Sequence, residues 1–296
     1  MDNVLTLIAG EGRLDESTVS HIEMTLRGAG ADVAPPDWLS YGAAVDLVFG
    51  SMPPADAVDL AVEVIEDAPF DAVAQPADGR RKRLLIADME STIIENEMLD
   101  ELADEVGLRN RIAAITARAM NGELDFEGAL RERVGLLQGL EEAALARTRT
   151  KIRITPGARE LVATMRRAGS YCALVSGGFS YYTNFIRDAV GFDMDQANQL
   201  EIQNGKLTGQ VVEPILGRSA KLERLRALAE ARHIPQEATM AVGDGANDLD
   251  MLAAAGLGVA YHAKPLVARS ARARIDHADL TALLYLQGYR EDEIIR

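Results

Sequence analysis

The sequence predicts an α/β protein built on a doubly wound parallel sheet, with a helical insertion and a separate N-terminal α+β unit. Three short apolar runs carry this prediction, at residues 84–87, 171–175 and 239–242. Continuous apolar runs of this length are typical of strands covered on both faces of a parallel sheet. Such folds bind ligands beyond the carboxyl ends of their strands, so we expect a functional site where these runs end.

The composition excludes several classes of protein. At 296 residues the chain can hold a catalytic domain and a smaller partner domain, and 48% hydrophobic residues support a well-filled core. The formal charge of −15 argues against binding to nucleic acid. No apolar run approaches about 18 residues and no signal peptide opens the chain, so we expect no membrane span and a cytoplasmic protein. The single cysteine, Cys172, lies inside an expected strand, which excludes an internal disulfide.

Residues 1–80 read as a separate domain. We expect three strands and two helices there, at 5–10, 43–50 and 71–75 and at 17–30 and 55–67, with a further strand near 32–34. The order β-α-β-β-α-β is that of a ferredoxin-like module, and it resembles the ACT-type regulatory domains. The alternative is a degenerate domain that is kept for dimer contacts or for stability. The polar segment 77–83 leads into a second domain at 81–296.

A helical insertion follows the first strand end. Four helical patterns are expected, at residues 96–107, 109–121, 125–138 and 141–150. The first of them has amphipathic i, i+3, i+4, i+7 spacing, at Leu99, Leu102, Ala103 and Val106. An all-helical segment placed here predicts a cap over the site, at approximately residues 93–152. Further on, the Asn204-Gly205 turn predicts a tight hairpin between 200–203 and 206–212.

The three strand ends carry carboxylates, a hydroxyl and glycines. They read Asp88-Met89-Glu90-Ser91-Thr92, Ser176-Gly177-Gly178 and Gly243-Asp244-Gly245-Ala246-Asn247-Asp248. A single carboxylate at such a position is also what a helix N-cap supplies, but three unrelated caps do not easily produce this set in this order. A dinucleotide fingerprint is excluded, because Asp248 occupies the third glycine position.

Taken together, the motifs resemble those of the haloacid dehalogenase-like (HAD) phosphohydrolases: D-x-[DE]-S-T, then S-G-G, then a lysine, then G-D-G-x-N-D. The likeness covers roughly residues 82–290, includes the tracts NGKLTG and SAKLERL, and is strongest to members that hydrolyse O-phospho-L-serine. It implies a HAD-like Rossmannoid core and a Mg²⁺ cofactor. One position departs from the family, whose second motif carboxylate is usually Asp and is here Glu90.

The resemblance implies a covalent mechanism. Asp88 would attack phosphorus to form an aspartyl-phosphate, and Glu90 would act first as general acid and then as general base. Ser176 and Lys221 would neutralise the phosphoryl oxygens. A competing interpretation, in which Glu90 marks impaired or altered chemistry, stays open here.

The resemblance also implies a metal site and a substrate site. Asp88, Asp244 and the main-chain carbonyl of Glu90 would bind Mg²⁺, while Asn247 and Asp248 would orient its waters and ligands. Glu97 would bind the substrate ammonium and Arg133 its carboxylate, and the family spacing from Phe126 favours Arg133 over Arg131. The remaining substrate contacts would come from Met120, Phe126, Ser176, Gly177, Gly178 and Asn247.

We therefore expect a Mg²⁺-dependent enzyme that hydrolyses O-phospho-L-serine, the last step of serine biosynthesis, with a small molecule as its partner and a homodimer as one expected assembly. A transferase that passes the phosphoryl group to an alcohol such as homoserine is one alternative. A catalytically poor amino-acid sensor is another, although a sensor would have no reason to keep Asp88, Lys221 and Asp244.

Overall fold

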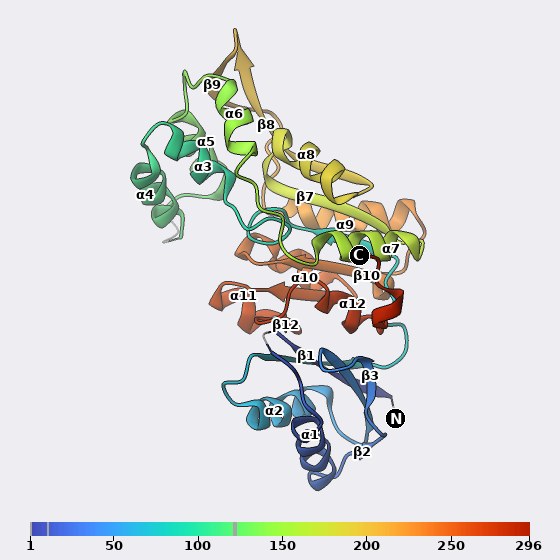
Figure 1. The fold of residues 1–296 in the computed structure, drawn as a ribbon. Helices are drawn as coiled ribbons and strands as arrows, with labels where there is room; N and C mark the ends of the chain where they lie inside the picture. The colour runs from blue at the N-terminus through green and yellow to red at the C-terminus, as the bar shows by residue number, and fades with distance from the viewer. Residues whose placement is uncertain (1, 11, 121–122) are drawn as a thin grey trace.

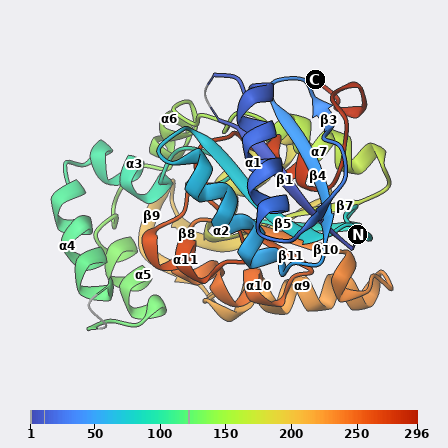
Figure 2. The same cartoon turned by 90° about the horizontal axis from the view of Figure 1, so that it is seen from below.

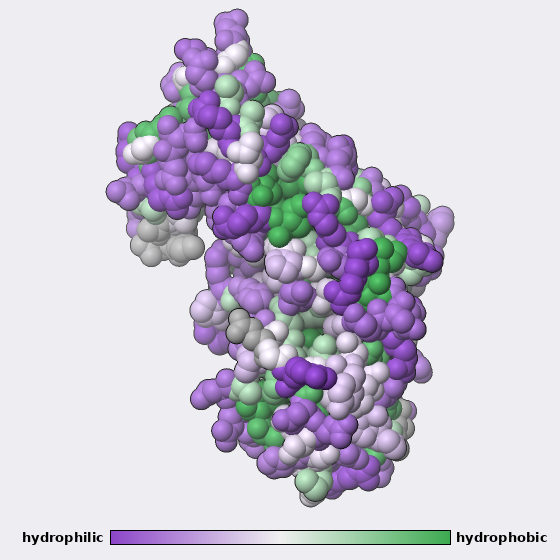
Figure 3. Space-filling view, viewed as in Figure 1, coloured by the Kyte–Doolittle hydropathy of each residue, from purple (hydrophilic) through white to green (hydrophobic). Residues whose placement is uncertain are grey.

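The computed structural model describes residues 2–10, 12–120 and 123–296. Its N-terminal domain lies at the bottom of Figure 1, the core in the middle and a helical insertion at the upper left. The molecular surface is hollowed on the left, between the helical insertion and the core (Figure 3). None of the described helices combines the length and the apolar character that crossing a bilayer requires.

The N-terminal domain is an antiparallel sheet with two helices. Its elements are β1 (Asn3–Ala9), α1 (Glu16–Gly28), β2 (Asp32–Val33), β3 (Asp37–Ser40), β4 (Ala44–Gly50), α2 (Pro54–Ile65) and β5 (Phe70–Pro76). The strand order is β2-β4-β1-β5, and β3 also pairs with β4. The strand expected near residues 32–34 is present as the short β2. Figure 2 shows α1 and α2 covering the outer face of this sheet.

The second domain is built on a mixed, mainly parallel sheet. Its strands are β6 (Leu84–Ala87), β7 (Tyr171–Phe179), β8 (Met194–Gln203), β9 (Lys206–Val212), β10 (Thr239–Gly243), β11 (Leu257–Tyr261) and β12 (Ala273–Ile275). They lie in the order β12-β11-β10-β6-β7-β8-β9. The expected sheet is thus parallel from β12 to β8, whereas β9 runs antiparallel to β8 because the Asn204-Gly205 turn joins them as a hairpin.

Both faces of this sheet are covered, as the continuous apolar strands predict. Leu84 and Ile86 belong to one hydrophobic cluster together with Leu225. Leu85 and Ala87, which point to the opposite face, belong to another. The helices of this domain are α7 (Ala158–Arg167), α8 (Ser180–Val190), α9 (Ser219–Ala231), α10 (Leu249–Ala254), α11 (Pro265–Ser270) and α12 (Ala282–Leu286). Three single-turn 3₁₀ helices complete it, at Gln236–Ala238, Ala246–Asp248 and Glu291–Glu293. The predicted α/β class is confirmed.

The insertion between β6 and α7 is helical. It comprises α3 (Met98–Glu105), α4 (Arg109–Met120), α5 (Phe126–Gly135) and α6 (Ala143–Arg149). All four expected helices are present, although α5 ends at Gly135 rather than continuing to residue 138. Together with the β8–β9 hairpin, these helices project to one side of the core sheet (Figure 1).

The N-terminal domain is joined to the core by buried polar contacts. Arg80 donates to the Asp46 carboxylate and the Thr6 hydroxyl on one side, and to the carbonyl oxygens of Tyr285 and Leu286 on the other. The Asp71 carboxylate accepts backbone N–H groups from residues 276–278. Buried polar groups with fixed partners resist movement of one domain against the other, so the two domains form a continuous structure.

Candidate active site

The structure brings the three strand ends to one edge of the sheet. Because β6 lies between β10 and β7, Asp88 is flanked by Asp244 after β10 and by Ser176 near the end of β7. The Asp88 N–H donates to the Val242 carbonyl oxygen at 3.0 Å, which continues the strand pairing into the site. This is the convergence that parallel strand order predicts.

Asp88 is almost fully buried, with 5% of its surface exposed. Its Oδ1 accepts the Met89 N–H at 2.7 Å and lies 2.7 Å from Lys221 Nζ. Two donors therefore hold one carboxylate oxygen in place, and this fixes the direction in which the other oxygen points.

Lys221, from α9, is a buried cation between two carboxylates. Its Nζ lies 2.6 Å from Asp248 Oδ1 as well as contacting Asp88. Burial alone would lower the pKa of the Lys221 ammonium, but the charges of Asp88 and Asp248 outweigh burial and raise this pKa above its ordinary value. Lys221 therefore carries a positive charge at neutral pH.

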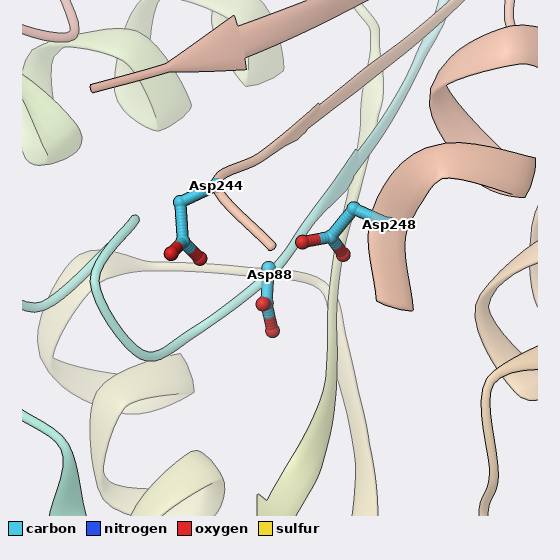
Figure 4. Close-up of side chains that lie close together, drawn as sticks. All are labelled: Asp88, Asp244 and Asp248. Carbon is cyan, nitrogen blue, oxygen red and sulfur yellow. The ribbon is translucent and has the colours of Figure 1, made fainter. Parts of the chain in front are cut away.

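Three aspartates form a compact oxygen cluster. One carboxylate oxygen from each of Asp88, Asp244 and Asp248 lies within 4.8 Å of the others, and Figure 4 shows Asp88 close to Asp244 and Asp248, which both follow β10. Burial raises the pKa of Asp244, and burial together with the Asp88 charge raises the pKa of Asp248 to about 7. Three carboxylate oxygens this close together form a ligand set that suits a hard divalent cation such as Mg²⁺. Asp248, expected outside the ligand set, has its carboxylate inside this cluster.

The loop after β10 is shaped by its first glycine. Asp248 Oδ2 accepts the Gly245 N–H at 3.0 Å, which folds the carboxylate back over the loop. A Cβ at Gly243 would overlap that carboxylate, so only glycine leaves room for Asp248 to reach Lys221. The Asn247 amide lies against Gly245 on the same turn.

Glu90 spans the gap between the core and the insertion. Its Oε1 accepts the Met98 N–H of α3 at 2.9 Å, and its Oε2 lies close to Gly178. Burial, followed by the charge of Glu97, raises the pKa of Glu90 to about 8. This carboxyl therefore holds its proton more tightly than an ordinary glutamate does, which suits a group that acts as a general acid.

The last residues of β7 are held by hydrogen bonds within the strand and from β8. Ser176 Oγ accepts the Gly178 N–H at 2.9 Å, and Asn198 Nδ2 donates to the Gly177 carbonyl oxygen at 2.8 Å. The Gly178 N–H, expected to face phosphate oxygens, is thus engaged by Ser176 in this structure. A Cβ at Gly177 would lie 3.0 Å from the Phe126 ring, so the start of α5 touches this end of β7.

The insertion also presents opposite charges to the crevice. Glu97 precedes α3 and accepts a hydrogen bond from Ser91 Oγ at 2.8 Å. Partial removal from water raises the pKa of Glu97. Burial lowers the pKa of Arg133, while the charges of Glu90 and Glu97 raise it, and its Nε donates to the Ala129 carbonyl oxygen at 3.2 Å.

Arg131, the competitor of Arg133, is exposed and pairs with Glu213 on the outer side of the insertion. Met120 ends α4, but its side chain lies outside the described residues.

Sequence reasoning assigned no role to two residues that contact the site. Lys264 follows β11, and its Nζ lies 3.2 Å from Asp244 Oδ2. Its signal was a fourth apolar run, residues 257–261, that ends close to a charged residue. Ser91 lies inside the first motif with a positive φ of 53° and bonds Glu97. Nothing in its position along the chain indicated that partner.

Comparison with known proteins defines the class. Residues 85–253 match the haloacid dehalogenase-like hydrolases, and this match covers more than half of the chain. The protein therefore belongs to the haloacid dehalogenase-like hydrolase family.

Within that family, its relatives include curated phosphoserine phosphatases. The phosphoserine phosphatase of Streptomyces coelicolor is 40% identical over 269 residues, which are 86% of this chain and 66% of the relative. That of Methanocaldococcus jannaschii is 40% identical over 205 residues, 69% of this chain and 97% of the relative. The crystal structure of a probable phosphoserine phosphatase from Vibrio cholerae has a TM-score of 0.81 at 31% identity, covering 99% of this chain and 88% of that one. The chain spans 53–66% of the length of several curated relatives.

Proposed function

We propose that this protein is a Mg²⁺-dependent phosphatase that hydrolyses O-phospho-L-serine to L-serine and phosphate, which would complete serine biosynthesis. The observation that carries the proposal is the placement of Asp88, held by Lys221, two residues before a buried Glu90 whose carboxylate accepts the Met98 N–H of the insertion. Similarity to phosphoserine phosphatases over the whole catalytic domain supports the choice of substrate.

In the first step, the Asp88 carboxylate attacks phosphorus and the bond from phosphorus to the serine oxygen breaks. Glu90 gives its proton to that oxygen, so serine leaves as an alcohol rather than as an alkoxide. Lys221 stabilises the negative charge that gathers on the phosphoryl oxygens. Asp88 ends this step as an aspartyl-phosphate, and Glu90 ends it as a carboxylate.

In the second step, Glu90 takes a proton from water while the water oxygen attacks phosphorus. The bond between phosphorus and Asp88 breaks, which releases phosphate and restores both side chains. A bound Mg²⁺, held by the cluster of Asp88, Asp244 and Asp248, would supply positive charge to the phosphoryl oxygens.

Substrate selection rests on the insertion, which we propose acts as a cap. Glu97 and Arg133 both belong to the insertion and carry opposite charges, and phosphoserine carries an ammonium and a carboxylate to match them. The contact of Phe126 with Gly177 supports closure over the phosphate site. We propose that residues 1–80 form an ACT-like domain, on the basis of their strand order. A homodimer and a cytoplasmic location stay predictions.

Phosphate release from L-phosphoserine, with Mg²⁺ or with excess EDTA, tests the function. We expect metal-dependent release that exceeds release from sugar and nucleotide phosphates. Asp88→Asn should lower turnover by at least about 10⁴-fold, since the nucleophile is lost. Asp59→Asn, an exposed change on α2, is the matched control and should leave the rate unchanged.

Three outcomes would count against the proposal. Retained activity in Asp88→Asn would exclude the covalent mechanism. Release from a different phosphate but not from phosphoserine would keep the mechanism and overturn the roles of Glu97 and Arg133. If no phosphate is released from any substrate, assays with alcohol acceptors and serine-binding calorimetry would separate the transferase from the sensor.

A further inference from the structure

Lys264 makes two contacts with Asp244, one through its backbone and one through its side chain. The Lys264 N–H donates to the Asp244 carbonyl oxygen at 3.1 Å. Its ammonium lies 3.2 Å from Asp244 Oδ2. The backbone contact does not depend on the identity of the side chain. Truncating Lys264 should therefore remove a charge and leave the path of the loop intact.

The Lys264 side chain can leave Asp244 at little cost. It is 54% exposed, whereas the Asp244 side chain is 8% exposed. Ion pairs of such exposed lysines contribute little to stability, and a flexible four-carbon stem lets the ammonium move into water. Lys221 differs, because its side chain is 4% exposed and it is held by two carboxylates.

The negative charge of three aspartates explains why a second cation, Lys264, lies beside them. Asp88, Asp244 and Asp248 converge within 4.8 Å, and Lys221 contacts two of these but not Asp244. Lys264 supplies the missing positive charge to the third. A divalent cation bound to Asp244 would place two positive charges beside the ammonium, which Coulomb repulsion disfavours.

We propose that Lys264 is a positioning residue of the metal site, which neutralises Asp244 in the metal-free enzyme and competes with Mg²⁺ for that carboxylate. The inference rests on the metal-dependent function proposed above. It predicts that Lys264 weakens metal binding, so that the metal can exchange.

Isothermal titration calorimetry with MgCl₂ alone tests this competition without any turnover. Lys264→Met should bind Mg²⁺ about threefold to tenfold more tightly than the wild-type chain at low salt. Lys264→Arg keeps the charge and should stay within about twofold of the wild-type affinity. The gain in Lys264→Met should shrink as KCl is raised from 50 to 500 mM, because salt screens the repulsion.

Lys206→Met is the matched control. Lys206 lies on the distant β8–β9 hairpin, is 55% exposed, and its Nζ lies 3.2 Å from Glu141 Oε1. This variant should leave the Mg²⁺ affinity unchanged. Asp244→Asn should abolish Mg²⁺ binding, which would show that the heat measured for the wild-type chain comes from this site. Circular dichroism of each variant checks that it is folded.

Weaker or unchanged Mg²⁺ binding in folded Lys264→Met would overturn the proposal. So would a wild-type chain that binds no Mg²⁺, or an Asp244→Asn variant that still binds it, because no competition at Asp244 then exists. Failure of the proposed function has a different signature: Mg²⁺ binds with the expected order of affinities, but phosphoserine releases no phosphate.

Discussion

The Glu90 side chain, which is one methylene group longer than the Asp usual in the family, contacts two parts of the site. Its carboxylate reaches the Met98 N–H on α3 with one oxygen and lies against Gly178 with the other. Both neighbours shield it from water, and Glu97 adds a negative charge nearby. Burial and the Glu97 charge favour the protonated form, and they outweigh the Met98 N–H, whose hydrogen bond favours the ionised form. The residue that departs from the family motif is therefore well suited to donate a proton.

The raised pKa of Glu90 predicts a pH-dependent stability. Between its ordinary value of 4.5 and about 8, the unfolded chain releases this proton while the folded chain keeps it. Ionised Glu90 thus favours unfolding increasingly as pH rises through this window. Glu90→Gln, which is always neutral, should raise the Tm in EDTA more at pH 8 than at pH 5.

Differential scanning calorimetry at the two pH values measures this change. Glu95→Gln is the control, because Glu95 is an exposed neighbour paired with Arg153. An equal Tm change at both pH values in Glu90→Gln would show that Glu90 titrates normally.

Arg133 and Arg131 lie on the same helix, and only Arg133 is proposed to bind substrate. Arg133→Met should lower kcat/KM for phosphoserine by roughly 10- to 100-fold, the cost of losing charged hydrogen bonds to a carboxylate. Hydrolysis of p-nitrophenyl phosphate, which has no carboxylate, should change by less than about threefold. Arg131→Met, which removes an exposed ion pair with Glu213, should affect neither substrate. Equal losses on both substrates would assign Arg133 a structural role.

At the scale of elements, the site depends on how closely segments approach. Phe126 at the start of α5 touches the end of β7, and the 3₁₀ turn Ala246–Asp248 folds onto Gly243. These contacts need glycine at positions 177 and 243, because a side chain at Gly177 or Gly243 would push the neighbouring element away. The glycines therefore set the distance between catalytic groups.

Gly243→Ala tests this dependence on approach. The added Cβ would displace Asp248 and weaken its ion pair with Lys221, so turnover should fall by at least about 100-fold. The free energy of unfolding should fall by about 1–3 kcal/mol, as is usual for overpacking. Gly28→Ala, in α1 with open space around it, should be neutral or slightly stabilising in both measurements. Full activity in Gly243→Ala would mean that the loop can shift without cost.

At the scale of the whole molecule, the N-terminal sheet is covered on both faces. Leu5 and Leu7 pack with α1 and α2, while Ile8 and Val73 join the hydrophobic core of the catalytic domain. The polar contacts of Asp71 and Arg80 fix the position of the two domains relative to each other. We expect the two domains to unfold together, since separating them would expose apolar surface and leave buried carboxylates unpaired.

Arg80→Met should destabilise the protein by about 3–5 kcal/mol, because it leaves Asp46 buried without its cation. Urea unfolding measures this free energy. Arg81→Met is the adjacent control: Arg81 is 48% exposed and pairs with Glu293, so its loss should cost about 1 kcal/mol. Equal costs for the two variants would show that Arg80 does not couple the domains.

Several features of this protein were determined by its sequence alone. The apolar runs before Asp88, Ser176 and Asp244 defined a sheet covered on both faces, and the motifs after them identified the family. This worked because strand burial and motif chemistry are local properties, written in consecutive residues. The helices of the insertion were visible for the same reason.

Other features were decided only by the tertiary structure. The contact of Lys264 with Asp244, the hydrogen bond from Ser91 to Glu97 and the place of Asp248 inside the carboxylate cluster join residues through space. The docking of residues 1–80 through Arg80 and Asp71 is of the same kind. Long-range polar contacts depend on side-chain direction and on burial by other segments, and neither property can be read from the order of residues along the chain.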